Sequence, residues 1–440
     1  MRGLPVILLL LLAACSQPSE TTQELVDRSA DLRVFEEGFL AVDNSFSDSA
    51  RAEAQERLEE LKQASGKMND TQFELAIAEI AALTENGHST LYAAHWAEKF
   101  NRLAVRFYIA DDGLFVADAQ PGFEELIGKK VERVAGQNLA DLRVIWDRYH
   151  NGTVGYRDQT LYYFIESPEI LHAAGLAKSA DEVTLEFAGG GKATIPVTTD
   201  WPAPEGIWAI LPLAREIELS KAGRVAEAPL YLQVPDAFYR TAGLADGDVP
   251  YIQFRANVDF SRQIDMHEVT QSTIDELRQE KPRYVIVDQR FNIGGDLNTT
   301  RDLMQALPEI VGSDGQIFVI TSGRTFSAGI ASVGYLKQAS GAQLTIIGKP
   351  VGDLLEFWAE GQPVQLPQSG AYLGVATERH NYMTGCPEDD CHGSIRLHPI
   401  TIDNLEPDLK PAFTYDDLVA GHDPFLTAAL RLIEEREKAD

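Results

Sequence analysis

The C-terminal half of the chain alternates short, almost wholly apolar runs with stretches at helical spacing. Four such runs read PYIQF, RYVIVDQ, QIFVIT and LTIIG, at residues 250–254, 283–289, 316–321 and 344–348. We expect helices between them, through 273–277, near 301–307 and after 327. Apolar strands separated by helices are typical of a largely parallel sheet covered by helices. This half is therefore predicted to form an α/β domain.

Three further segments precede that domain, which spans 226–440. Residues 25–102 carry apolar side chains at helical spacing and predict a small helical domain. Residues 103–200 alternate short runs with glycines, in the order of a β-rich, PDZ-like module, and residues 201–225 begin WPAPEG and predict a linker. A chain of 440 residues with 44% hydrophobic content can fill several cores. The expected fold class is multidomain α+β and α/β.

The N-terminus has the organisation of an export signal. Residues 1–14 place a basic residue before an apolar run that is too short to span a bilayer. The ending LAAC resembles the lipobox of bacterial lipoproteins, in which Cys15 is acylated and becomes the new N-terminus, and residues 15–24 would be the lipidated tether. Ser16 after it, by resemblance to Gram-negative lipoproteins, predicts the outer membrane facing the periplasm. The alternative is an ordinary signal peptide that contains a chance cysteine.

The net charge bears on nucleic-acid binding, and the other two cysteines bear on disulfide formation and metal binding. The formal net charge is -29, from 67 acidic and 38 basic residues spread along the chain, so nucleic acid is not an expected partner. Cys386 and Cys391 lie close together in GCPEDDCH, and in an oxidising compartment they predict a short-loop disulfide. A zinc site would need both cysteines, His392 and a fourth ligand, and no second CxxC or HxxxH cluster is present. We therefore expect no metal and no cofactor.

Ser327 lies in TSGRTFSAGI, directly after the run QIFVIT. A serine at a strand-to-helix turn is exposed at the carboxyl edge of the sheet, with small neighbours that let substrate approach and helix amides directed at developing negative charge. The alternative is that Ser327 only caps the helix.

Two other segments carry matching chemistry. Gly294 and Gly295, in VDQRFNIGGD, can expose backbone amides, and with the amide of Ala328 they would form an oxyanion hole. Phosphate binding is disfavoured because no GKS, GKT or GxGxxG pattern follows. His88, in ENGHST, is the residue type that usually acts as base for a serine hydroxyl, and its alternative is a histidine in an exposed turn.

Taken in order, the segments GHS, RFNIGG and TSGRTFSAG resemble the tail-specific, tricorn-like and retinoid-binding-protein superfamily of serine peptidases. The similarity continues through IGKPVG at 347–352, EPD at 406–408 and GHDPFL at 421–426, so it spans from about residue 70 to the C-terminus. The resemblance implies Ser327 as nucleophile, the paired glycines as oxyanion donors and a crotonase-like catalytic domain.

The superfamily divides by its catalytic base. One branch uses a lysine about 25 residues after the serine, which here falls near Asp353, while Lys349 occupies the glutamate position of the family's GEPT segment. The Ser-His branch fits better, with His88 as base.

Two departures leave the third catalytic residue unassigned. Asn86 stands where the family usually has Asp, and no glutamate precedes the PD segment. Asp403 is the candidate acid, with Glu378 and Glu356 as weaker candidates, and each has the alternative of a solvated surface carboxylate.

The leading hypothesis is a serine-type peptidase that hydrolyses envelope or imported polypeptides through an acyl-enzyme, with the PDZ-like module presenting a peptide. One alternative is a catalytically silent relative that binds a hydrophobic ligand or an envelope partner. Another is an esterase that uses the same site. The oligomeric state and the physiological substrate stay open.

Overall fold

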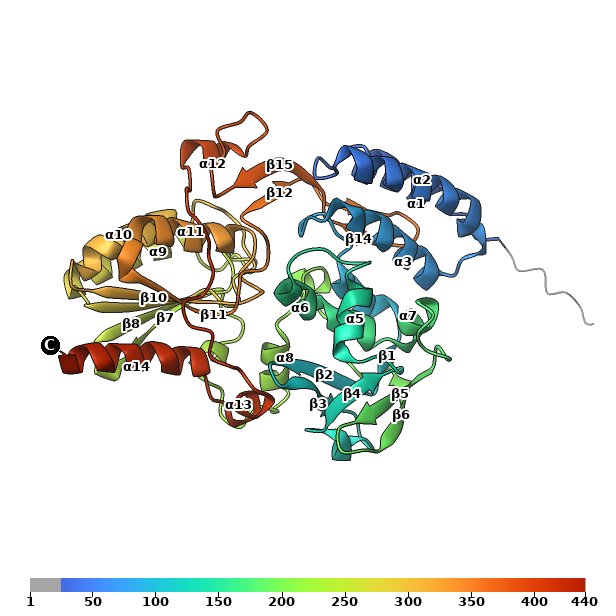
Figure 1. The fold of residues 1–440 in the computed structure, drawn as a ribbon, viewed down its shortest axis with the longest axis horizontal. Coiled ribbons are helices and arrows are strands. Elements are labelled where there is room, and N and C mark those ends of the chain that lie inside the picture. The colour runs from blue at the N-terminus through green and yellow to red at the C-terminus, as the bar shows by residue number, and fades with distance from the viewer. Residues whose placement is uncertain (1–24, 440) are drawn as a thin grey trace, which may run out of the picture.

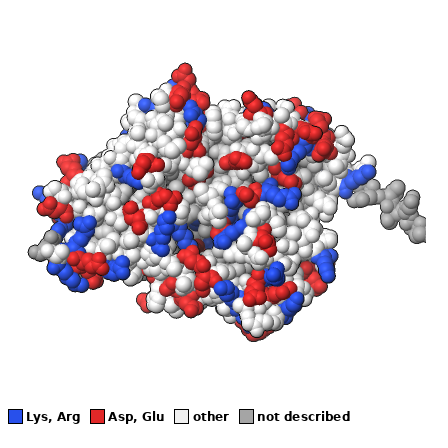
Figure 2. Space-filling view, in the orientation of Figure 1, with Lys and Arg blue, Asp and Glu red and all other residues white. Residues whose placement is uncertain are grey.

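The computed structural model describes residues 25–439, which form two lobes. In Figure 1 one lobe contains the sheet of β7 to β11 with its helices, and the other contains the N-terminal helices and the sheet of β1 to β6. Among the described residues, no helix is both long and apolar enough to cross a membrane. Figure 2 shows acidic and basic side chains interspersed over the face in view.

The α/β lobe is built on a five-stranded sheet in the order β11-β10-β9-β8-β7. Strands β8 to β11 are parallel, and β7 pairs antiparallel with β8 at the edge. The bounds are β7 Tyr239–Leu244, β8 Val249–Phe254, β9 Tyr284–Asp288, β10 Gln316–Thr321 and β11 Leu344–Gly348. The four apolar runs of the sequence are therefore the four parallel strands, as predicted.

Helices cover both faces of this sheet. Figure 1 shows α9, α10 and α11 on one face and α14 on the other. Each parallel strand pairs with the next along the chain, so right-handed crossovers place the three connecting helices on the same side. Within β9, Val285 and Val287 join the core under these helices, while Tyr284 and Ile286 join the core on the opposite face. The helices are α9 Met266–Glu280, α10 Arg301–Val311, α11 Ala328–Ser340 and α14 Pro424–Ala439.

The other lobe combines helices with a six-stranded antiparallel sheet in the order β1-β6-β5-β4-β3-β2. The helices are α1 Ser29–Val34, α2 Asp48–Ala64, α3 Asp70–Ala81, α4 Trp96–Lys99, α5 Leu139–Trp146, α6 Val154–Ile165 and α7 Pro168–Ala173. The strands are β1 Arg102–Leu103, β2 Val105–Ala110, β3 Gly113–Ala119, β4 Lys130–Val134, β5 Glu182–Phe187 and β6 Lys192–Thr198. A capping box at Asn69 starts α3, the helix that leads to His88.

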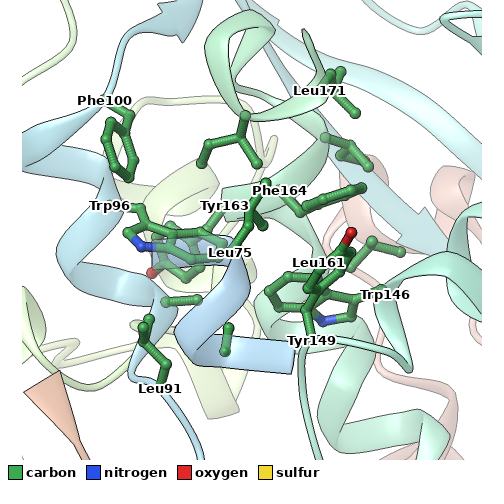
Figure 3. Packing of buried hydrophobic residues seen from close by; sticks show 14 of the residues in the cluster. Leu75, Leu91, Trp96, Phe100, Trp146, Tyr149, Leu161, Tyr163, Phe164 and Leu171 are labelled. Carbon is green, nitrogen blue, oxygen red and sulfur yellow. The ribbon is translucent and has the colours of Figure 1, made fainter. Parts of the chain in front are cut away.

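One hydrophobic core runs through the whole of this lobe. Figure 3 shows Leu75 and Trp96 of the helical segment packed with Trp146 and Phe164 of the segment predicted to be β-rich. Leu373 of the C-terminal half belongs to the same cluster. The core is thus continuous across the expected boundary at residue 102, because the helices bury their apolar faces against the sheet and its inserted helices.

Two segments connect the lobes. Residues 201–225, the expected linker, contain α8 (Arg215–Lys221), and the Arg215 guanidinium lies 3.1 Å from the buried carboxylate of Glu166. In the C-terminal half, β12 pairs antiparallel with β15 to form the β12–β15 ribbon, and β13 pairs with β14. Their bounds are β12 Glu356–Glu360, β13 Val364–Gln365, β14 Tyr372–Leu373 and β15 Ala376–Asn381. The short helices α12 (Gly393–Leu397) and α13 (Tyr415–Ala420) complete the fold.

Candidate active site

Ser327 occupies the turn between β10 and α11 with a strained backbone. Its φ is 53° and its ψ is -126°, a conformation that non-glycine residues rarely adopt. Although it is the residue before α11, its side chain makes no capping hydrogen bond. The hydroxyl is therefore not used to cap the helix, and it lines a pocket instead.

The glycine-rich turn after β9 holds the serine turn in place. The amide of Phe326 donates to the carbonyl of Asn292 over 2.9 Å, and the hydroxyl of Thr325 donates to the carbonyl of Gln289 over 2.8 Å. A Cβ atom on Gly294 would lie 2.6 Å from Cβ of Ser327, so only glycine permits this approach. The two sequence motifs are thus joined by hydrogen bonds and close backbone contact.

Three amides were expected to form an oxyanion hole, and the structure distinguishes among them. The Gly294 amide donates to the side-chain oxygen of Asn292 over 3.0 Å, so it is already engaged. Within residues 25–439 no acceptor binds the Gly295 amide. The Ala328 amide is the first of α11 and has no acceptor within the helix. Of the three expected donors, Gly295 and Ala328 are therefore the two whose amides are free within this part of the chain.

His88 is held between two aromatic rings. Its ring stacks on Phe326 with centroids 4.4 Å apart and on Phe357, from β12, with centroids 4.9 Å apart. The side chain is 15% exposed, and neither ring nitrogen has a hydrogen-bond partner among the described residues. This sandwich fixes the plane of the imidazole, and both ring nitrogens are buried and free of hydrogen bonds to the rest of the described chain.

Asp353 is the carboxylate beside this histidine. Its Oδ2 lies 3.4 Å from His88 Nδ1, and its side chain is only 4% exposed. A separation of 3.4 Å is long for a hydrogen bond, although catalytic contacts often tighten when substrate binds. With Nδ1 facing Asp353, Nε2 is the nitrogen left for a hydroxyl in the pocket.

Sequence analysis did not select Asp353 as an acid. It was considered only as the place where other family members have a lysine, and its neighbour Leu354 is exposed. The signal that could have identified it is Gly87, because a Cβ there would lie 2.5 Å from Oδ2 of Asp353. The glycine of the GHS motif makes room for this carboxylate.

Asn86 has a structural explanation. Its side-chain oxygen accepts from the backbone amide of Trp358, and its side-chain nitrogen donates to the carbonyl of the same residue, each over 2.9 Å. An aspartate could only accept, so it could not make both bonds. Asn86 thereby attaches the turn that carries His88 to β12.

A small pocket of about 150 Å³ opens beside the serine and the histidine, at the junction of the two lobes. His88 and Ser327 both line it, but no hydrogen bond joins them. Leu211 and Pro212, from the segment expected to be a linker, form another part of the wall. The Arg324 side chain donates to the Pro212 carbonyl over 2.7 Å and holds this segment in place.

The other expected acids lie elsewhere. Asp403 is 76% exposed and pairs with Lys337, ten residues along α11 from Ser327, which corresponds to about 15 Å of helix. The structure therefore does not bring Asp403 to His88. Glu356 pairs with Arg379, and Glu378 lies 3.9 Å from His392 on the β12–β15 ribbon.

The cysteines divide between two regions. Cys386 and Cys391 form a disulfide in the loop after β15. Cys15, with the predicted signal peptide and tether, lies outside the described residues.

The arginine of the RFNIGG motif has a structural role. Arg290 is buried, and its guanidinium makes paired hydrogen bonds of 3.0 and 2.8 Å to Asp423, at the start of α14. It also lies 2.9 Å from Asp288 at the end of β9. Two separate motifs, RFNIGG and GHDPFL, thus meet in one buried ion-pair network behind the serine turn.

Comparison with known proteins gives a shared fold. Mature CPAF in complex with lactacystin matches with a TM-score of 0.54 and 13% identity, over 93% of this chain and 99% of that one. Another structure of mature CPAF matches with a TM-score of 0.54 and 14% identity, over 93% of this chain and 98% of that one. A CPAF mutant matches with a TM-score of 0.51 and 13% identity, over 92% of this chain and 96% of that one. No family model and no curated protein matches the chain. At this identity the likeness shows the fold alone, and that fold fits the superfamily that the sequence motifs resemble.

Proposed function

We propose that the protein is a serine peptidase that cleaves polypeptides through an acyl-enzyme. The observation that carries this proposal is the Ser327 hydroxyl, which is free of any capping bond in a strained turn and shares a pocket with His88. The Asp353 carboxylate behind the imidazole supplies the third group that such a site needs.

In this mechanism the Nε2 atom of His88 accepts the Ser327 proton while the serine oxygen attacks the substrate carbonyl. Asp353 orients the ring and stabilises the imidazolium that forms. The oxyanion is bound by the amides of Ala328 and Gly295. The imidazolium then protonates the leaving amine, and water activated by His88 releases the acyl group from Ser327.

The geometry around the base suits proton transfer. Phe326 and Phe357 exclude water from both faces of the imidazole, and both of its nitrogens are buried. Substrate that fills the pocket would bring the serine hydroxyl and Nε2 into hydrogen-bond contact, as happens at many sites whose bonds are long without substrate. The small pocket favours a short apolar or aromatic-stacking group next to the cleaved bond.

A serine-directed label tests the assignment. Wild-type protein is expected to react with a fluorophosphonate at one serine and to degrade casein. Ser327→Ala should lose both activities, and His88→Ala should lower both by at least about 10³-fold. Ser313→Ala, at an exposed serine that lines no part of the pocket, is the matched control. Equal labelling of wild type and Ser327→Ala would refute the proposal.

Two alternatives are separated by the same reagents. A catalytically silent binding protein is favoured by the missing bond between His88 and Ser327 and by the Pro212 segment in the pocket wall. An unreactive wild type would support that alternative. An esterase would use the same serine, so parallel assays with peptide and ester substrates distinguish it from a peptidase.

We also propose that the chain acts at the periplasmic side of the outer membrane, anchored through lipid on Cys15. The lipid anchor rests on the LAAC ending, and the outer-membrane location rests on Ser16 after it. Labelled fatty acid should be incorporated into wild type and not into Cys15→Ser. Incorporation into both would contradict it.

A further inference from the structure

The β12–β15 ribbon carries a cluster of metal-ligating side chains outside the proposed active site. We propose that Glu360, His380 and His392 form a divalent-metal site of the kind that takes Zn²⁺. One ligand atom from each residue lies within 4.8 Å of the other two. The three residues are 20 and 12 positions apart in the sequence (380 − 360 and 392 − 380), with no CxxC or HxxxH cluster to mark them.

The donor set and its dimensions suit zinc. Two imidazoles and one carboxylate leave a fourth tetrahedral position open, an arrangement that zinc adopts in proteins. Tetrahedral zinc with bonds of about 2.05 Å places neighbouring ligand atoms about 3.4 Å apart. Nε2 of His380 and Oε1 of Glu360 are already 3.3 Å apart. His392, whose side chain is 23% exposed and whose ring stacks on that of His380 with centroids 5.3 Å apart, has to move closer and to turn toward the ion.

A buried nitrogen without a hydrogen bond points to a missing ligand. His380 is 1% exposed, and the 3.3 Å ion-pair contact of its Nε2 with Glu360 does not meet hydrogen-bond geometry. Its other nitrogen, Nδ1, lies 3.3 Å from the Tyr382 hydroxyl, which would orient the ring of a metal-bound histidine. The Nδ1 atom of His392 is also buried without a partner. Such groups are normally satisfied, and a bound ion would satisfy them here.

The backbone presents these side chains in fixed positions. Glu360 has a φ of 70°, next to a shift in the β12–β15 register between Ala359 and Glu360. Such irregularities redirect a side chain. The His392 amide donates to the carbonyl of Arg379 over 3.0 Å, which places His392 beside the strand that carries His380. His392 also directly follows the disulfide-bonded Cys391.

The site lies at the end of a stack of rings that reaches His88. The Phe357 ring lies 4.8 Å from that of His380 and 4.9 Å from that of His88. A bound ion would brace the ribbon that carries Phe357. Metal binding does not depend on the chemistry of Ser327, so its test stands apart from that of the proposed peptidase.

The test uses the full chain with its disulfide intact. After treatment with a chelator, wild type should bind about one Zn²⁺ per chain in calorimetry, and Co²⁺ should produce the visible absorption of a tetrahedral site. Glu360→Gln, which preserves shape, and His392→Ala should each weaken zinc binding by more than about tenfold. Zinc should raise the melting temperature of wild type and not of Glu360→Gln.

The matched control is His422→Ala, at a histidine whose side chain is 73% exposed at the end of α13. It should bind zinc as wild type does. The proposal is overturned if wild type binds no zinc, or if both ligand variants bind it unchanged. Binding that occurs only after reduction of the disulfide would also overturn it, because the Cys386 and Cys391 thiolates would then be the ligands.

Discussion

Replacing Gly87 with alanine separates Asp353 from His88 without touching either side chain. Gly87 does not have a positive φ, so its backbone accepts alanine. The new Cβ would lie 2.5 Å from Oδ2 of Asp353 and 3.1 Å from Cε2 of Phe326. Ordinary contact begins at 3.4 Å, so the carboxylate has to retreat by 3.4 − 2.5 = 0.9 Å.

That retreat would lengthen a contact that is already 3.4 Å between Nδ1 and Oδ2. At about 4 Å or more, Asp353 no longer fixes the tautomer or the orientation of the imidazole. Displacing a catalytic group by roughly 1 Å costs about 10²-fold in rate. We therefore expect Gly87→Ala to lower the rate of fluorophosphonate labelling by about 100-fold.

The assay compares labelling rates of wild type, Gly87→Ala and Gly66→Ala by gel fluorescence. Gly66 is the control because an added Cβ there would be 3.5 Å or more from its neighbours. Thermal unfolding of all three proteins checks that the fold is kept. If Gly87→Ala is folded and reacts as fast as wild type, then Asp353 does not support His88 and the reasoning is wrong.

Three further substitutions test other parts of the argument. Asn86→Asp loses the donor to the Trp358 carbonyl and should lower the free energy of unfolding by about 1–3 kcal/mol in urea titrations, with slower labelling. Arg290→Met leaves Asp423 buried without its partner and should cost about 3–5 kcal/mol in the same titration, whereas an unchanged midpoint would show that the network is not needed. Burial lowers the pKa of His150 from 6.5 to about 4. Between about pH 6.5 and pH 4, this histidine is therefore protonated in the unfolded chain and neutral in the folded chain. Stability is therefore lost as the pH falls through this window, by about 3 kcal/mol, and His150→Gln should remove that loss. Equal acid sensitivity of the two proteins would contradict the assignment.

Much of the α/β lobe could be predicted because its signals are local. Each parallel strand is buried on both faces and reads as a continuous apolar run, so strands and helices could be recognised from a few adjacent residues. Ser327, Gly294 and Ala328 come together because the carboxyl ends of neighbouring parallel strands meet at one edge of the sheet. The core that residues 25–102 and 103–200 share was harder to foresee, since apolar faces do not specify which partner they pack against.

The carboxylate beside His88 is not one of those that sequence reasoning selected. Asp403 was chosen for its position before a motif, but the chain there lies on the exposed surface beside Lys337. Asp353 reaches His88 only because two lobes meet, and its neighbours in sequence carry no sign of that contact. The relation between Gly87 and Asp353 is steric and spans 266 residues of chain (353 − 87).

The sequence by itself determined the four parallel strands of the α/β lobe, the strand-to-helix turn at Ser327 and the chemistry of the motif residues, because these depend on burial patterns and on turns of a few residues. Only the tertiary structure decided which carboxylate accompanies His88, that residues 201–225 line the pocket, and that Glu360, His380 and His392 converge. The physical reason is that His88, Asp353 and Pro212 lie far apart in the chain and meet only once the separate cores have packed together. Glu360, His380 and His392 converge instead through the strand pairing of one ribbon and the loop that follows it.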